Sequence, residues 1–112
     1  MNDWVRELHA EVMVCDTHGT ILEMNAEAET LFSEAGGSSL LGTNVLTCHP
    51  EPSRTKLSGM MEDQIPNAYF NTEEGEKRFF CQSPWFKDGK YAGFVEISFP
   101  AADHIPHFVR GV

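Results

Sequence analysis

The clearest pattern of apolar and polar positions lies near the N-terminus, in the segment VMVCDTHGTILEMN at residues 12–25. An apolar run, a turn that contains Gly19 and a second apolar run lead to Asn25. Glycine can adopt the positive φ that a tight turn requires, and asparagine is a preferred residue at a helix N-cap. The pattern therefore predicts a hairpin of two strands, over 11–16 and 20–24, followed by a helix that Asn25 caps.

The remaining sequence predicts further helices and three more strands. Trp4, Val5 and Leu8 are spaced by three and four residues, as on one face of a short amphipathic helix. Pro52 fits the first turn of a second main helix, and Asp88–Gly89 between two apolar runs is a strong hairpin signal. The expected helices cover 3–11, 26–35 and about 52–64, and the expected strands cover 67–72, 77–86 and 91–99.

Alternation along the last strand predicts which of its faces is buried. Glu96 and Ser98 share one face, whereas Val95, Ile97 and Phe99 share the other. We expect the second face to pack in the core, because successive side chains of a strand point to opposite sides of the sheet. Five antiparallel strands with helices on one face form an α+β architecture.

Length and charge narrow the possible classes of protein. The 112 residues, of which 41% are hydrophobic, suffice for one domain with a single core. The formal net charge of −9 repels phosphate backbones and anionic membranes, so we expect neither nucleic-acid nor membrane binding. No apolar stretch approaches the roughly 18 residues of a membrane span. Cys15, Cys48 and Cys81 are well separated and form no CxxC pair, which favours free thiols and a cytoplasmic location.

The element order and three motifs resemble the PAS family of sensor domains. The motifs are VCDTHGTILEMNAEAETLF, the GxN sequence at 42–44 and the closing hairpin FKDGKYAGFVEIS. The resemblance implies a PAS fold over 11–100, with a five-stranded antiparallel sheet, an N-terminal helix within 1–10 and a tail over 101–112. In this family the cavity between sheet and helices often holds a small ligand or cofactor, and the outer sheet face often carries the N-terminal helix and a dimer contact.

The cofactors of known PAS domains match this sequence poorly. In light-oxygen-voltage domains a cysteine that attacks the flavin follows the GxN asparagine, but Val45 occupies that position here. In oxygen-sensing PAS kinases an axial histidine binds haem, and the corresponding position here is Leu57. No cofactor is required by the sequence, although Cys48 and His49 are candidate contacts for a haem held in another geometry.

Signatures of enzymes and metal sites are weak. The sequence contains no GxSxG, P-loop, HExxH or dinucleotide-binding motif. Cys48 and His49 are adjacent, but nucleophile pairs are generally assembled in space rather than in sequence. His104 and His107 form an HxxH pair, which Pro106 makes unsuitable for a regular helix. We therefore expect neither catalysis nor a metal site.

The apolar interior supplies the candidate ligand site. Several methionines near one site are typical of adaptable packing around a ligand, and an ordinary filled core is the alternative. The residues predicted to line a pocket are Met13, Met24, Leu31, Val45, Leu57, Met60, Met61, Phe70, Phe79, Val95 and Ile97. The amphipathic face formed by Trp4, Val5 and Leu8 predicts a homodimer contact.

Together these observations predict a PAS signal-input module. It senses a small molecule or a partner and relays the change through its sheet and terminal helix to a downstream signalling protein. Two alternatives remain open, a haem- or flavin-binding redox or gas sensor and a protein-interaction module with a filled core. The module acts either alone or as part of a larger regulator.

Overall fold

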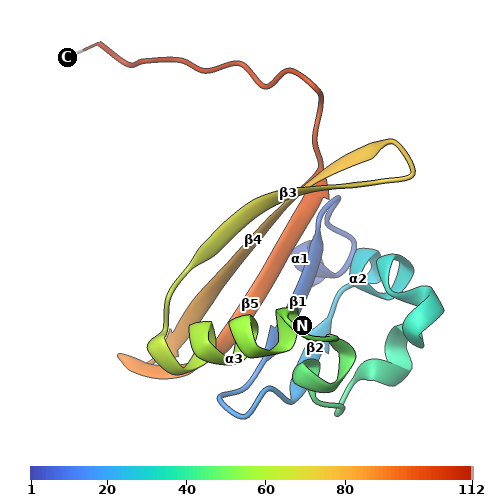
Figure 1. Cartoon of the computed structure of the whole chain (residues 1–112), viewed down its shortest axis with the longest axis vertical. Helices are drawn as coiled ribbons and strands as arrows, with labels where there is room; N and C mark the ends of the chain where they lie inside the picture. Colours follow the sequence, from blue (N-terminus) through green and yellow to red (C-terminus); the bar gives the residue numbers. More distant parts are fainter. Residues whose placement is uncertain (112) are drawn as a thin grey trace.

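The structure, a computed structural model that describes residues 1–111, is built on a five-stranded antiparallel sheet in the order β2-β1-β5-β4-β3 (Figure 1). The strands are β1 (Glu11–Cys15), β2 (Ile21–Met24), β3 (Asn67–Glu73), β4 (Glu76–Lys87) and β5 (Lys90–Pro100). The α-helices are α1 (Asp3–Arg6), α2 (Ala26–Leu31) and α3 (Ser53–Asp63), and the 3-10 helices are η1 (Ser33–Ala35), η2 (Gly37–Leu40) and η3 (Val45–Cys48). The predicted α+β fold with a five-stranded antiparallel sheet is confirmed.

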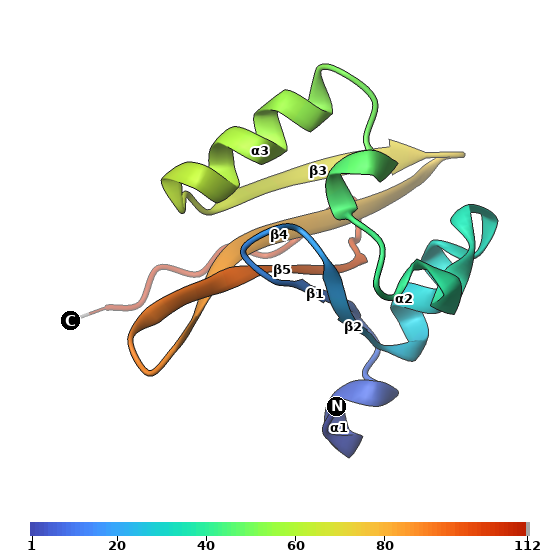
Figure 2. The same ribbon diagram turned by 90° about the horizontal axis from the view of Figure 1, so that it is seen from below.

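The helices do not all lie on the same side of the sheet. In Figure 2, α3 lies on one side of the strands and α1 lies on the other. We call the side that faces α3 the inner face and the opposite side the outer face. None of the helices within residues 1–111 is long and apolar enough to cross a membrane.

Two clusters of buried side chains join the inner face of the sheet to the helices. The first cluster joins α2 and η2 to the β1–β2 hairpin and contains Met13, Ile21, Met24, Ala28 and Leu40. The second cluster joins α3 to β1 and β5 and contains Cys15, Leu57, Met61 and Phe94. The apolar stripe of α3 is therefore what holds this helix over the sheet.

Asn25 connects three elements at the end of β2. Its side-chain Oδ1 accepts hydrogen bonds from the backbone N–H groups of Ala28 and Val12, both at 3.0 Å, so the predicted helix cap is confirmed. Its Nδ2 donates to the carbonyl oxygens of Val5 at 3.0 Å and Ala10 at 2.7 Å. Asn25 is fully buried, and its four bonds tie the backbone of α1, β1 and α2 to one side chain.

The first two helices are shorter than the sequence predicts. In place of the expected helix over 3–11, α1 is a single turn with no buried residue. The helix cannot continue to residue 11, because the Ala10 carbonyl accepts a hydrogen bond from Asn25 and Glu11 already belongs to β1. The expected helix over 26–35 ends at Leu31 and continues as 3-10 turns. The last three strands extend at most one residue beyond their predicted bounds at either end.

The predicted orientation of β5 is wrong. Phe94 and Ser98 are 4% and 0% exposed on the inner face, whereas Ile97 and Phe99 are 40% and 39% exposed on the outer face. The polar residues Glu96 and Ser98 point inward because hydrogen-bonding partners from neighbouring strands meet them there. The outer face keeps an apolar surface that the described residues leave partly open to solvent.

Residues 101–111 follow β5 without forming a helix or strand. Figure 1 shows this segment leaving the end of the sheet and running away from the rest of the chain. Two of its apolar side chains, Phe108 and Val109, are 83% and 90% exposed. The tail therefore contributes little to the core in this structure.

Candidate functional site

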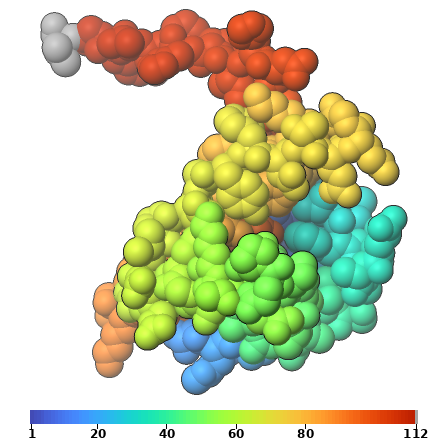
Figure 3. Space-filling model, in the orientation of Figure 1, coloured from blue at the N-terminus to red at the C-terminus, as the bar shows by residue number. Residues whose placement is uncertain are grey.

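A cavity of about 210 Å³ lies between the inner face of the sheet and the segment from α2 to α3. In Figure 3 the surface is hollowed where β3, the α2 region and the α3 region meet, and parts of the sheet are visible inside this hollow. The cavity is lined by Met13, Cys15, Ile21, Phe32, Ala35, Leu40, Val45, Cys48, His49, Leu57, Met61, Tyr69, Phe80, Gln82, Phe94, Val95 and Glu96. Most of this wall is apolar, so the cavity suits a ligand with an apolar body.

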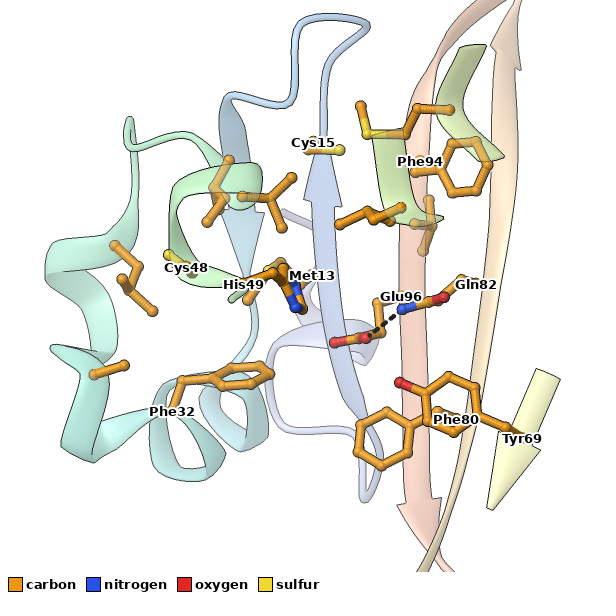
Figure 4. Close-up of a pocket in the computed structure, with 17 residues that line it drawn as sticks. Met13, Cys15, Phe32, Cys48, His49, Tyr69, Phe80, Gln82, Phe94 and Glu96 are labelled. Atoms are coloured by element: carbon orange, nitrogen blue, oxygen red, sulfur yellow. Dashed lines mark hydrogen bonds between the residues drawn. The ribbon is translucent and has the colours of Figure 1, made fainter. Parts of the chain in front are cut away.

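The polar part of the wall is a pair of side chains on β4 and β5. Gln82 Nε2 donates a hydrogen bond to Glu96 Oε1 at 3.0 Å (Figure 4). Asn67 Nδ2 in turn donates to Gln82 Oε1 at 3.4 Å, which is at the long end for a hydrogen bond. These bonds fix the amide and leave a carboxyl group in the wall, where a ligand can reach it.

A second acidic side chain, Glu11, lies behind Glu96 on β1. It is fully buried, and its Oε1 accepts a hydrogen bond from Ser98 Oγ at 2.7 Å. Ser98 Oγ itself accepts from Arg78 Nε at 2.8 Å. The pairing Met13↔Glu96 and Glu11↔Ser98 between β1 and β5 brings these groups together, although β1 and β5 lie at opposite ends of the sequence.

The two carboxyl groups change each other's ionisation. Burial and the neighbouring charge of Glu96 raise the pKa of Glu11 to about 9, and burial also raises the pKa of Glu96. The two side chains are close enough to act on each other electrostatically. Glu11 Oε2 is buried and has no hydrogen-bond partner, so the neutral, protonated form of Glu11 is the less costly one in this position. The pair therefore retains at least one proton at neutral pH.

Aromatic rings surround the carboxyl group of Glu96. Tyr69 and Phe80 lie next to the Glu96–Gln82 pair and Phe32 lies across the cavity (Figure 4). The rings of Tyr69 and Phe80 are stacked, with centroids 5.2 Å apart. Burial raises the pKa of Tyr69, and the acidic Glu96 and Glu11 raise it further, so its hydroxyl group stays protonated.

Some of the residues predicted from the sequence to line a pocket do line this cavity. They are Met13, Val45, Leu57, Met61 and Val95. Cys48 and His49, the candidate cofactor contacts, also belong to the wall. The charge of His49 acts on Glu96, which places the imidazole close enough to influence the carboxyl group.

The other predicted pocket residues lie elsewhere: Met24, Leu31, Met60, Phe70, Phe79 and Ile97. Met24 belongs to the first core cluster and Leu31 is 39% exposed. Phe70 and Phe79 pair across β3 and β4 on the outer face, where Ile97 also lies. Their expected position is wrong for the same reason as the orientation of β5, since the more apolar face of these strands is not the one that faces the helices.

Sequence reasoning missed the polar part of the site. Gln82 and Glu96 alternate with apolar residues, as solvent-facing side chains do, so periodicity alone places them outside. Two signals nevertheless exist in the sequence. Glu11 directly follows a helical pattern and opens an apolar strand, and Ser98 and Glu96 share a face with the large apolar Phe94.

The size of the cavity tests the cofactors of known PAS domains. Its volume is near that of a cavity of about 150 Å³ that binds benzene, and below the roughly 300–1,000 Å³ of sites for drug-sized ligands. A haem or a flavin is at least as large as a drug-sized ligand, so neither fits this cavity of about 210 Å³ in this conformation. Within residues 1–111, no group of three or more His, Cys, Asp or Glu side chains is arranged to hold a metal ion.

Comparison with solved structures identifies the fold. No family model and no curated protein matches the sequence. The PAS domain of BvgS from Bordetella pertussis superimposes with a TM-score of 0.66 at 12% identity, over 88% of this chain and 82% of that one. The Vibrio cholerae receptor Aer2, described as a dual PAS-haem oxygen sensor, superimposes with a TM-score of 0.63 at 15% identity, over 83% of this chain and 95% of that one. A sensory box sensor histidine kinase from the same organism superimposes with a TM-score of 0.63 at 13% identity, over 89% of this chain and 88% of that one.

These similarities define the class of fold: the chain has the PAS fold, as its sequence motifs predict. At identities below 20% they carry no information on what this chain binds. The cavity and its polar wall therefore have to be interpreted from their own chemistry.

Proposed function

We propose that this chain is a non-catalytic signal-input module that binds a small molecule in the cavity between its sheet and helices. The observation that carries the proposal is an apolar cavity of about 210 Å³ with the hydrogen-bonded Glu96–Gln82 pair in its wall. A few polar groups in an apolar cavity are typical of ligand sites, where they orient the ligand. The similar folds of sensor proteins support the same interpretation.

The proposed relay runs from the cavity to the N-terminal helix. Glu96 acts electrostatically on Glu11, the first residue of β1, and the preceding carbonyl of Ala10 accepts a hydrogen bond from Asn25. Asn25 also holds the Val5 carbonyl in α1. A ligand that moves Glu96 therefore acts through Glu11, the backbone of β1 and the hydrogen bonds of Asn25 on the position of α1, and so on a downstream signalling protein that contacts α1.

Native mass spectrometry of the freshly purified protein tests ligand binding directly. We expect a mass increment from a small molecule, lost after denaturation. Repeated preparations without an increment, together with no binding in a fragment screen, would support a protein-interaction module with a filled core instead. A visible absorption spectrum recorded on the same sample tests the haem or flavin alternative, for which the cavity is too small.

We propose that the module forms a homodimer through Trp4, Val5 and Leu8. Trp4 is 69% exposed and Leu8 is 36% exposed on the single turn of α1 and the residues after it. We expect Trp4→Asp to shift the mass measured by light scattering from dimer to monomer. Phe108→Asp is the matched control, because Phe108 is 83% exposed in the tail and lies outside the proposed contact. A protein that is monomeric at high concentration, or a Trp4→Asp variant that stays dimeric, would contradict the proposal.

The outer face supports a protein-interaction role as a second candidate function. Phe70, Ile97 and Phe99 are 49%, 40% and 39% exposed there. Exposed apolar patches of this kind often mark contacts with other proteins. A cytoplasmic location is proposed from the three cysteines, which form no disulfide.

A further inference from the structure

We propose that the cavity selects a small organic cation, with an ammonium group that binds Glu96 and an aromatic or aliphatic body that fills the apolar space. This inference rests on the proposed function and names the ligand class for the same cavity. Its basis is the combination of one acidic side chain, several aromatic rings and the lack of Lys or Arg among the lining residues that the structure describes.

The carboxyl pair provides one negative charge for one cation. With one proton held on Glu11 and none on Glu96, the pair carries a net charge of minus one. Gln82 Nε2 donates to Oε1 of Glu96, and Glu11 Oε2 has no hydrogen-bond partner. A ligand N–H group that donates to Glu96 adds the missing positive charge in a place where an unpaired carboxylate is costly.

The aromatic wall provides the second recognition element. Phe32, Tyr69, Phe80 and Phe94 line the cavity, and the stacked pair Tyr69–Phe80 lies beside Glu96. A cation near the face of an aromatic ring is attracted by the ring quadrupole, and this attraction is stronger away from water. The net charge of −9 of the chain further favours cations over anions on approach.

The charged groups around the cavity determine how binding depends on pH. Glu11 on β1 and Glu96 on β5 face each other, Arg78 on β4 reaches them through Ser98, and His49 before α3 acts on Glu96 from across the cavity. Tyr69 on β3 and the Cys15 thiol on β1 stay protonated and neutral. Raising the pH removes the second proton of the carboxyl pair, whose pKa is raised by the burial of Glu96, so the affinity for a cation should rise.

Three probes of equal size separate cation binding from cavity binding. Isothermal titration calorimetry with benzylamine, benzyl alcohol and benzoate is carried out on the full chain and on Glu96→Gln, which keeps the side-chain shape but removes the charge. We expect benzylamine to bind at least about tenfold more tightly than benzyl alcohol at about pH 8, with an affinity that falls towards about pH 5. Benzyl alcohol should bind both proteins equally and independently of pH, which also shows that the variant is folded.

Each other outcome overturns the inference. Benzyl alcohol or benzoate binding as tightly as benzylamine would exclude a cation-selective site but would leave the proposed small-molecule sensor intact. Benzylamine binding that is independent of pH, or unchanged in Glu96→Gln, would show that the amine binds elsewhere. If Glu96→Gln does not fold, the test is the pH dependence of benzylamine affinity in the unmodified chain, and an affinity that does not fall towards about pH 5 overturns the inference. If no probe binds and xenon does not enter the cavity, the proposed function fails together with the inference.

Discussion

Ser98 Oγ donates a hydrogen bond to Glu11 Oε1 over 2.7 Å, and both side chains are completely buried although 87 positions separate them in the sequence. The same hydroxyl group accepts from Arg78 Nε. Ser98 therefore links the only guanidinium group of this network to the carboxyl pair at the cavity.

Ser98→Ala should destabilise the protein by about 1–3 kcal/mol, because it leaves the buried Glu11 Oε1 and Arg78 Nε without a partner. Ser39 provides a matched control, since its Oγ donates to the Gly36 carbonyl over the same 2.7 Å but is exposed to solvent. Ser39→Ala should cost less than about 1 kcal/mol, because water replaces the lost partner. Urea unfolding of both variants measures the difference, and equal losses would contradict burial as the cause.

The stability of the protein should fall as the pH rises from about 4.5 to about 9. Burial and Glu96 raise the pKa of Glu11 from 4.5 to about 9, so the folded state holds a proton in this range that the unfolded state releases. This stabilisation is fully present below the pKa of Glu11 in the unfolded chain, about 4.5. It is lost as the pH rises towards the pKa of Glu11 in the folded protein, about 9, by at most about 1.4 kcal/mol per pH unit. Urea midpoints measured across this range should fall for the unmodified chain relative to Glu11→Gln as the pH rises, because glutamine stays neutral and has no proton to lose. Parallel pH profiles would show that Glu11 is ionised in the folded state.

Asn25→Asp should loosen α1 while it preserves the cap of α2. The carboxylate can still accept from Val12 and Ala28, but it cannot donate to the Val5 and Ala10 carbonyls. We expect a loss of about 2–4 kcal/mol, with faster amide exchange in residues 3–10 than in α2. Asn44→Asp is the control, because Asn44 also caps a helical turn and donates to one carbonyl, but its hydrogen bond to His18 is exposed. Uniformly increased exchange throughout the chain would contradict a specific link to α1.

Gly93→Ala should destabilise β5 strongly. Gly93 has a φ of 141°, and a Cβ there would overlap the carbonyl oxygen of Cys15 on the neighbouring strand. We expect a loss of at least about 1–3 kcal/mol from the backbone conformation alone. Gly59→Ala in α3 is the opposite case, because nothing lies within 4 Å of the added methyl group, and it should stabilise the helix by about 0.5–1 kcal/mol. Thermal denaturation of the two variants should move in opposite directions.

The sequence predicts this fold well wherever structure is decided locally. The Asn25 cap and the Asp88–Gly89 turn depend on residues next to one another, and both occur as predicted. The orientation of β5 depends instead on groups far away in the sequence. Glu96 and Ser98 face inward because Gln82 and Glu11 come from other strands to meet them, and no periodicity in β5 contains that information.

The candidate site shows the same division. Met13, Leu57 and Met61 are predicted to line the cavity because each belongs to the apolar face of an element that must pack on something. The sequence also predicts Phe70 and Ile97 in the cavity because they are apolar, yet both lie on the outer face. Apolar character predicts which residues avoid water but not which side of a sheet the helices will cover.

The central claim is that a small molecule enters the cavity between sheet and helices, and the five methionines test it most directly. Met13 and Met61 line the cavity, whereas Met1, Met24 and Met60 do not. With ¹³C-labelled methionine methyl groups and benzene as the probe, we expect the NMR signals of Met13 and Met61 to shift and saturate together while the other three stay in place. Signals of Met13 and Met61 that do not move, or equal shifts of all five methyl groups, would contradict the account.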